Sequence, residues 1–270
     1  MISTITKAFE GALEITKPEV KEAIREAIAG LDNGSLRVSE QKNPGEWITH
    51  AWLKQAILLF FRTQSNVLIN SGDLNFYDKI PLKKWTGKEG VRIVPQALVR
   101  IGAFVESGAI LMPSYVNIGA YVGSGTLVDT WATVGSCAQV GKNVHLSGGV
   151  GLGGVLEPVQ ASPVIIEDDV FVGSRCVIVE GAVIESGAVV GAGCVITAST
   201  KIIDVTQSTP VISKGRVPKN AVLIPGTIPK TFAAGSFGVP CALIIGQRSA
   251  KTNLKTSLND ALRVISETEQ

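Results

Sequence analysis

The chain has 270 residues and a formal net charge of +2, with 45% hydrophobic and 18% charged residues. The near-neutral charge offers no basic surface for nucleic acid, and the longest strongly apolar run, residues 56–61, is too short to span a bilayer. The amphipathic N-terminus lacks the continuous apolar stretch of a secretory signal, so we expect a cytoplasmic protein without nucleic-acid or membrane partners.

Apolar residues at helical spacing predict two amphipathic helices at the start of the chain, the second ending at Asn33-Gly34. Alternation of apolar and polar residues predicts a short strand at 36–38. The apolar content of residues 47–62 predicts a third helix that is well buried, and we expect residues 63–90 to be irregular. Residues 1–90 are therefore interpreted as an N-terminal helical domain.

A six-residue repeat of apolar side chains occupies the middle of the chain. With Leu98 in the first position, every sixth residue is apolar as far as Leu152, and after one interruption the register resumes from Ile166 to Ile196. The fifth position is almost always no larger than valine, and the second is often glycine. Such a period predicts a mainly β fold, a parallel β-helix in which three hexads form one coil of a triangular prism. We expect about five coils within residues 91–205.

The interruption is expected to be an external loop. Residues 158–165 contain two prolines and cannot lie inside a coil, and a single excursion from a regular scaffold is usually functional. After the prism, residues 206–270 predict a small C-terminal element of short strands and a last helix. The apolar face of that helix would consist of Leu258, Ala261, Leu262 and Ile265.

The cysteines have no spacing typical of a metal site. Cys176 and Cys194 occupy the small fifth position of a hexad, where cysteine behaves as a compact hydrophobic residue. We therefore expect core roles for the cysteines and no bound metal.

Asp129 is unusual within its hexad. It occupies the second position, where glycine is common, and lies close to Trp131. A carboxylate beside a large aromatic side chain on a flat face has no evident folding purpose, so Asp129 is a candidate acid or base. A solvated acid at a corner is the alternative.

Histidine is the usual acid–base residue near neutral pH, and the chain has two. His50 lies in the predicted third helix and is interpreted as structural. His145 lies in a glycine-rich stretch, and some β-helical acyltransferases use a histidine from such a turn as general base. His145 therefore competes with Asp129 and supports an alternative, an acetyltransferase that modifies a sugar or serine hydroxyl. A non-catalytic scaffold or metal-binding trimer is a third interpretation, opposed by the lack of histidines stacked at 18-residue spacing.

Glu180 is a further acidic candidate. Counting hexads places Asp129 and Glu180 on different sides of the prism, roughly 11 Å apart along its axis. A joint role would therefore need a neighbouring chain. The glycine run 148–154 is not followed by a helical pattern, so we interpret it as a place where a ligand approaches the backbone rather than as a dinucleotide site.

Three long motifs give the chain a specific resemblance. MPSYVNIGAYV at 112–122, VDTWATVGSCAQ at 128–139 and GKNVHLSGGVG at 141–151 closely resemble the tetrahydrodipicolinate N-succinyltransferases, and shorter matches extend over most of the chain. The resemblance implies a left-handed prism and a homotrimer with active sites between neighbouring prisms. It also implies transfer of a succinyl group from succinyl-CoA to the amine of tetrahydrodipicolinate, in lysine and diaminopimelate synthesis.

The resemblance also implies roles for individual residues. The substrate-contacting arginine of the family falls on Arg92 and its active-site aspartate on Asp129, whereas a further glutamate of several members is replaced by Val177. Glu180, three residues later, is the alternative second catalytic acid. Expected substrate-binding residues are Arg92, Asp129, Trp131, Ser136 and Glu157. Expected acyl-CoA-binding residues are Gly153, Gly154, Lys214, Arg216 and Lys251.

These assignments suggest a mechanism without a permanently bound cofactor, since succinyl-CoA is a co-substrate. Backbone N–H groups near Gly153 and Gly154 would stabilise the oxyanion, and the pantetheine arm would lie beneath the external loop. Burial between subunits would raise the pKa of Asp129 and make it a base; otherwise Asp129 positions the amine. The residues alone do not separate succinyl from acetyl donors.

Overall fold

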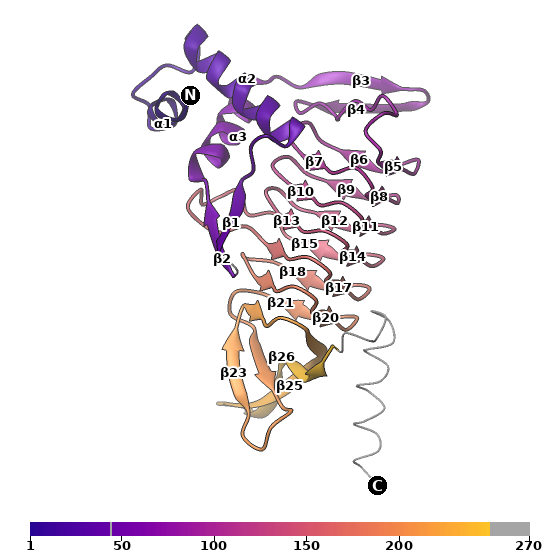
Figure 1. Cartoon of the computed structure of the whole chain (residues 1–270). Helices are drawn as coiled ribbons and strands as arrows, with labels where there is room; N and C mark the ends of the chain where they lie inside the picture. Colours follow the sequence, from indigo (N-terminus) through magenta and orange to yellow (C-terminus); the bar gives the residue numbers. More distant parts are fainter. Residues whose placement is uncertain (44, 249–270) are drawn as a thin grey trace.

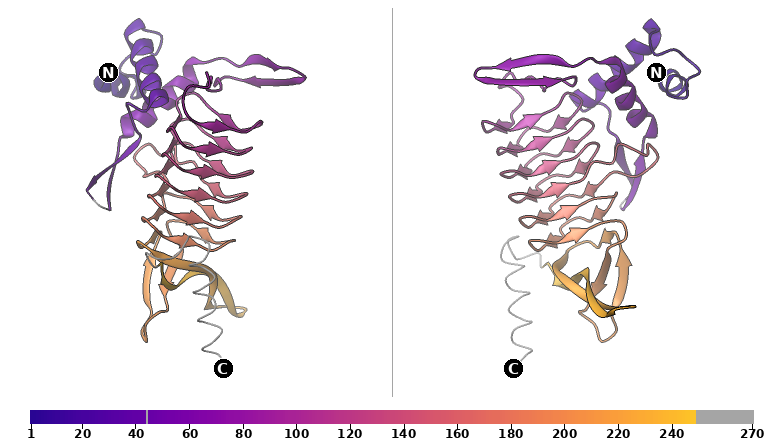
Figure 2. Two further views of the ribbon diagram at one scale, coloured as in Figure 1. Left: turned by 45° about the vertical axis from the view of Figure 1, so that its right-hand side comes forward. Right: turned by 180° about the vertical axis from the view of Figure 1, so that it is seen from behind.

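A computed structural model describes residues 1–43 and 45–248, and its centre is a three-sided prism of short parallel strands (Figure 1). The N-terminal helices lie at one end and along one flank of the prism, and C-terminal hairpins lie at the other end (Figure 2). Among the described residues, no helix is long and apolar enough to cross a membrane. The parallel β-helix predicted from the hexads is confirmed.

Each face of the prism is a parallel sheet with one strand from each coil. Face A contains β7 (Phe104–Val105), β10 (Tyr121–Val122), β13 (Gln139–Val140), β16 (Ile165–Ile166), β19 (Val183–Ile184) and β24 (Arg216–Val217). Face B contains β5 (Arg92–Ile93), β8 (Ile110–Leu111), β11 (Leu127–Val128), β14 (His145–Leu146), β17 (Phe171–Val172) and β20 (Val189–Val190). Face C contains β6 (Leu98–Val99), β9 (Tyr115–Val116), β12 (Thr133–Val134), β15 (Gly151–Leu152), β18 (Val177–Ile178) and β21 (Val195–Ile196). The chain runs from A to B to C, so the three edges are A–B, B–C and C–A.

The second residue of each prism strand points into the core. From Val116 onward the predicted register is confirmed, because these residues are buried. In the first coil the register was wrong by one residue, and the inward residues are Val99, Val105 and Leu111. Both residues of these strands are apolar, so the period alone does not show which one faces inward. A five-residue step from Leu111 to Val116 then restores the register.

Small residues in the prism have two separate causes. Cys176 and Cys194 are buried in the core as predicted, in the inward position that has little room. The second-position glycines do not adopt a positive φ, so backbone conformation is not what requires glycine at this position. A Cβ on Gly135 would instead lie 2.3 Å from the backbone nitrogen of Gly154, so close stacking of neighbouring coils requires glycine there.

The two predicted N-terminal helices are confirmed as α1 (Ile2–Phe9) and α2 (Pro18–Asn33). Gly34 ends α2 with a φ of 80°. The third helix, α3 (Ala51–Thr63), is shorter than predicted.

Residues 46–49, expected to be partly helical, form β2 (Glu46–Thr49), which pairs with β1 (Ser39–Asn43). The expected strand at 36–38 therefore lies slightly later in the chain. Trp47 Nε1 donates a hydrogen bond of 3.0 Å to Glu167 of the prism. This tertiary contact favours the extended conformation over the helix that local pattern predicts.

Residues expected to be irregular contain a hairpin of β3 (Val67–Ser71) and β4 (Leu74–Asp78), which projects sideways from the prism (Figure 1). Large apolar side chains of both strands are exposed, including Leu68 and Tyr77. The hairpin was missed because its strands lack the alternation of a half-buried sheet.

The external loop is present but begins earlier than predicted. Val164 occupies the small inward position and Ile165 is buried in β16, so the eight looped-out residues are 156–163 rather than 158–165. Leu156 leaves the prism because it packs against the helical cluster. Lys54 Nζ of α3 donates to the carbonyl oxygen of Ala161 at 2.5 Å and ties the loop to the helices.

At the far end, β22 (Lys201–Asp204), β23 (Val211–Lys214), β25 (Ala221–Phe232) and β26 (Gly235–Gln247) extend face B. The last two strands form a hairpin far longer than the short strands predicted. The sequence pattern misled because proline usually ends a strand, whereas the outer part of a two-stranded hairpin has open edges that accept proline. The predicted last helix lies outside the described residues.

Candidate active site

Edge B–C brings together the two competing acid–base candidates. Asp129 directly follows β11, and His145 begins β14 in the next coil. The Asp129 Oδ2 atom lies 3.6 Å from His145 Nε2. The two residues are therefore neighbours, and a single site can use both.

Hydrogen bonds hold Asp129 in place and keep it ionised. Its Oδ1 atom accepts from the Thr130 backbone nitrogen at 2.7 Å and from Thr130 Oγ1 at 3.2 Å. Burial acts to raise the pKa of Asp129, but the bonds from Thr130 and the proximity of His145 outweigh it, so the pKa is lowered. Burial within the single chain therefore does not raise the pKa of Asp129, and the effect of burial between subunits stays a prediction.

His145 presents an unpartnered nitrogen beside that carboxylate. Its Nε2 atom is buried and makes no hydrogen bond with the described residues, since 3.6 Å to Asp129 is too long. Phe171 packs edge-on against the imidazole, with ring centroids 5.2 Å apart. A buried polar nitrogen without a partner is uncommon, which makes His145 a candidate for contact with a ligand at this edge.

Trp131 lies on the same edge, at the left-handed position of a prism turn. Its φ is 60°, its side chain is 64% exposed, and its backbone nitrogen donates to the Pro113 carbonyl oxygen at 2.6 Å. Cys137, Asn143 and Arg175 have the same left-handed φ at the corresponding turn position of other coils, so this conformation belongs to the prism turn. The exposed indole lies close to Asp129, and its contact with substrate stays a prediction.

Arg175 belongs to this edge and was missed by sequence reasoning. Its φ is 61°, and its side chain lies across Gly149, where an added Cβ would be 2.8 Å from Arg175 Cδ. It makes no hydrogen bond through its side chain and no ion pair with any described residue. The available signal was its position three residues after a core residue, where the neighbouring coils have Gly149 and Gly193.

Arg92 lies on face B, exposed, in the first strand of the prism. It pairs with Ile110, which pairs with Leu127 beside Asp129. Two strand spacings separate Arg92 from Asp129, about 10 Å along the axis. That separation suits a small amino dicarboxylate with a carboxylate at Arg92 and its amine at Asp129.

The remaining predicted residues of the prism lie on the opposite edge of face C. Edge C–A and its loop carry Ser136, Gly153, Gly154, Glu157 and Glu180. Glu180 and Asp129 are therefore on different edges, as the hexad count predicted. Gly153 is not a free oxyanion donor, because its N–H bonds to the Ile178 carbonyl oxygen at 2.8 Å. The Gly154 N–H makes no such bond among the described residues.

The basic residues expected to bind CoA phosphates have different surroundings. Arg216 Nε donates to Glu185 Oε1 at 2.5 Å, and its Nη2 donates to the Gly45 carbonyl oxygen at 2.9 Å. These bonds hold Arg216 on face A, and its assignment to CoA stays a prediction. Lys214 is exposed on β23 at the far end of the prism, and Lys251 lies outside the described residues.

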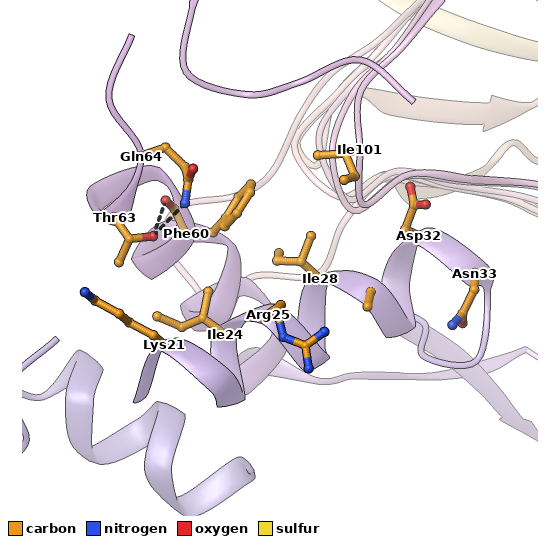
Figure 3. Close-up of a pocket in the computed structure, with 11 residues that line it drawn as sticks. Lys21, Ile24, Arg25, Ile28, Asp32, Asn33, Phe60, Thr63, Gln64 and Ile101 are labelled. Atoms are coloured by element: carbon orange, nitrogen blue, oxygen red, sulfur yellow. Dashed lines mark hydrogen bonds between the residues drawn. The ribbon is translucent and has the colours of Figure 1, made fainter. Parts of the chain in front are cut away.

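A cavity of about 680 Å³ lies between α2 and α3 of the helical domain (Figure 3). Its lining includes the apolar side chains Ile24, Ile28 and Phe60. It contains none of the predicted site residues, so it is separate from edge B–C.

Comparison with known proteins first defines the class. The family model for the hexapeptide repeat of succinyl-transferase matches residues 163–198. A Campylobacter jejuni structure described as a 2,3,4,5-tetrahydropyridine-2-carboxylate N-succinyltransferase has a TM-score of 0.57 and 18% identity, covering 88% of this chain and 64% of that chain. The fold is that of the hexapeptide-repeat proteins.

More similar relatives then define the family. The family model for the tetrahydrodipicolinate N-succinyltransferase N-terminal region matches residues 1–63. A 2,3,4,5-tetrahydropyridine-2,6-dicarboxylate N-succinyltransferase of Acinetobacter baumannii (strain SDF) is 53% identical over 96% of this chain and 97% of its own length. The corresponding Acinetobacter baylyi protein is 52% identical over the same shares. The chain belongs to the tetrahydrodipicolinate N-succinyltransferase family.

Proposed function

We propose that this protein transfers the succinyl group of succinyl-CoA to the amine of tetrahydrodipicolinate in its ring-opened form, L-2-amino-6-oxopimelate. The products are N-succinyl-2-amino-6-oxopimelate and CoA, in lysine and diaminopimelate biosynthesis. The observation that carries the proposal is the Asp129–His145 pair in a chain that matches N-succinyltransferases along nearly its whole length.

The reaction forms one C–N bond and breaks one C–S bond. The amine attacks the thioester carbonyl, the nitrogen loses a proton, and the sulfur leaves as the CoA thiol. His145 Nε2 takes the proton because it is the unpartnered basic atom beside the nucleophile. Asp129 stays ionised, orients the amine and stabilises the imidazolium that forms.

Two arginines bind the carboxylates of the substrates. Arg92 holds the dicarboxylate two strand spacings from Asp129. Arg175 binds the free carboxylate of the succinyl group, because it lies on edge B–C with no partner among the described residues. An acetyl group lacks that carboxylate, so Arg175 favours the succinyl donor.

A homotrimer would complete the site. Edge C–A carries Ser136, Gly154 and Glu180 but lies across face C from Asp129. A head-to-tail contact between prisms can place edge C–A of one subunit against edge B–C of its neighbour. Val177 and Val195, on the outer surface of face C, are 39% and 50% exposed and would be covered by such a contact.

The acyl donor would lie between neighbouring prisms. Its pantetheine arm runs beneath loop 156–163, and the Gly154 N–H stabilises the oxyanion. Succinyl-CoA is then a co-substrate and no cofactor is permanently bound. As a biosynthetic enzyme using acyl-CoA, the protein is expected in the cytoplasm.

A hydroxyl-directed acetyltransferase is the second candidate, favoured by the open Nε2 of His145. Thiol release with tetrahydrodipicolinate, measured with succinyl-CoA and with acetyl-CoA, separates the two. We expect kcat/KM at least about a hundredfold higher with succinyl-CoA, since a lost charged bond costs about 1.5–3 kcal/mol and a misplaced acyl group adds to it.

Arg175→Gln should remove most of this preference by raising KM for succinyl-CoA alone. Equal rates with both donors, or no reaction with tetrahydrodipicolinate, would contradict the proposal.

A further inference from the structure

A second cavity lies at edge A–B, away from Asp129 and His145. Its volume is about 170 Å³, and the β1–β2 hairpin covers it on one side. The lining consists of Arg37, Gln41, Trp47, Tyr121, Gly123, Gly141, Lys142, Glu167, Asp168 and Ser186. The reaction proposed for edge B–C uses none of these residues.

Arg37 is the most unusual residue in this cavity. Its guanidinium lies 3.7 Å from the centroid of the Tyr121 ring, and its Nε donates to Gln139 Oε1 at 2.7 Å. The two terminal nitrogens donate no hydrogen bond and form no ion pair within the described part of the chain. Burial lowers the pKa of Arg37, although nearby Tyr121 and acidic side chains oppose that effect. The cation is therefore partly stripped of water without a matching carboxylate.

Two carboxylates, Glu167 and Asp168, also line the cavity and differ in how fully their oxygens are hydrogen-bonded. Glu167 is 8% exposed, and its oxygens accept from Trp47 Nε1 at 3.0 Å and from Ser186 nitrogen and Oγ at 3.0 and 2.9 Å. Asp168 Oδ1 accepts from the Lys142 backbone nitrogen at 2.8 Å. Asp168 Oδ2 accepts no hydrogen bond from the described residues, so one carboxylate oxygen stays open at the rim.

We propose that this cavity binds a small zwitterion of the α-amino acid class, with its carboxylate on Arg37 and its ammonium group on Asp168. Arginine binds a carboxylate through two parallel N–H donors, and the stacked guanidinium is already oriented for it. A phosphate dianion fits less well, because Glu167 and Asp168 would repel it. A ligand that is only cationic also fits less well, because the positive charges of Arg37 and Lys142 would repel it.

The bound amino acid would join two parts of the fold. Gln41 and Trp47 belong to the hairpin, whereas Tyr121, Asp168 and Ser186 belong to the prism. Occupancy should therefore stabilise the hairpin against opening. Backbone amide hydrogen exchange of residues 39–49 is expected to slow when the ligand is present.

Isothermal titration of the full-length protein tests the proposal, with glycine, alanine, lysine and glutamate as probes and acetate, methylamine and inorganic phosphate as single-charge or dianion comparisons. Arg37→Lys keeps the charge but loses the paired donors, and Asp168→Asn keeps the bond from Lys142 but removes the negative charge. Asp169→Asn is the matched control, because this neighbour does not line the cavity.

We expect at least one amino acid to bind, with about tenfold weaker binding after Asp168→Asn or Arg37→Lys and unchanged binding after Asp169→Asn. Asp168 is exposed, so its variant tests the site even where Arg37→Lys loses stability. The proposal is overturned when no amino acid gives heat, when phosphate or acetate binds as well as the amino acids, or when Asp168→Asn and Asp169→Asn behave alike.

Discussion

Asp129 and His145 have complementary roles because each lacks what the other provides. Asp129 has a lowered pKa and is a weak base, yet its charge is fixed by Thr130. His145 has an open nitrogen but no hydrogen bond of its own at Nε2. Asp129 faces the same nitrogen, Nε2, that is assigned the proton. Its carboxylate can therefore stabilise the imidazolium by charge, but it does not orient the ring through the opposite nitrogen as the carboxylate of a catalytic triad does.

Changes to this pair should be strongly non-additive. Asp129→Asn keeps an oxygen for the Thr130 bond, and we expect kcat to fall by at least about a hundredfold, with His145→Ala causing a similar loss. The double variant should be little worse than either single variant, because the two residues act as one unit. Steady-state thiol release measures all three, with size-exclusion chromatography as a control for assembly. A near-normal rate for Asp129→Asn would remove it from catalysis, and fully multiplied losses would show independent roles.

At the scale of elements, loop 156–163 is shaped by a helix rather than by the prism alone. Lys54 of α3 has a fully buried side chain and reaches Ala161 of the loop. Desolvation lowers the pKa of Lys54, so burial of its charge opposes folding below that pKa and the opposition weakens as pH rises. The lysine therefore serves the position of the loop more than the stability of the chain.

Lys54→Met should separate these two effects. A methionine fills a similar volume without the charge, so we expect Tm at pH 7 to change by no more than a few degrees, because the lost bond and the removed buried charge offset each other. Without the bond to Ala161, amide exchange of residues 156–163 should speed up and KM for the acyl donor should rise severalfold. Lys7→Met, on the exposed surface of α1, is the control and should change neither the amide exchange of the loop nor KM for the acyl donor. Unchanged amide exchange of residues 156–163 in Lys54→Met would show that Lys54 does not hold the loop in place.

For the whole molecule, the decisive feature is that one face separates two groups of functional candidates. Asp129, Trp131 and Arg175 lie on edge B–C, whereas Ser136, Gly154 and Glu180 lie on edge C–A. One chain cannot close both groups around a small substrate. The proposed trimer solves this by pairing different edges of neighbouring subunits.

Val195→Glu tests the proposed contact. A charge introduced on an exposed valine of face C would be buried without a partner in the trimer, so we expect dissociation and loss of activity at low protein concentration. Val211→Glu, on the similarly exposed β23, is the matched control. Light scattering after gel filtration measures the mass of each variant. A trimeric and active Val195→Glu protein would place the subunit contact elsewhere.

Local patterns were sufficient for a large part of this fold. The hexads predicted the prism and its small inward residues, and helical spacing predicted α1 and α2, because these features repeat over short distances in the chain. The family motifs indicated Arg92 and Asp129. Independently of the motifs, Asp129 was noticed because it stands at a hexad position where glycine is common. Sequence reasoning also placed Asp129 and Glu180 on different sides of the prism, because each successive hexad forms the strand of the next face.

Other features were decided only by tertiary structure. The inward register of the first coil is set by packing inside the prism, where Val99, Val105 and Leu111 are buried, and β2 depends on the contact between Trp47 and Glu167. His145 and Asp129 become neighbours because β11 pairs with β14 one coil later, and Arg175 gains its place because it crosses Gly149. A period along the chain determines that coils stack, but the side chains that meet between coils, loop and helices are set by contacts between distant residues.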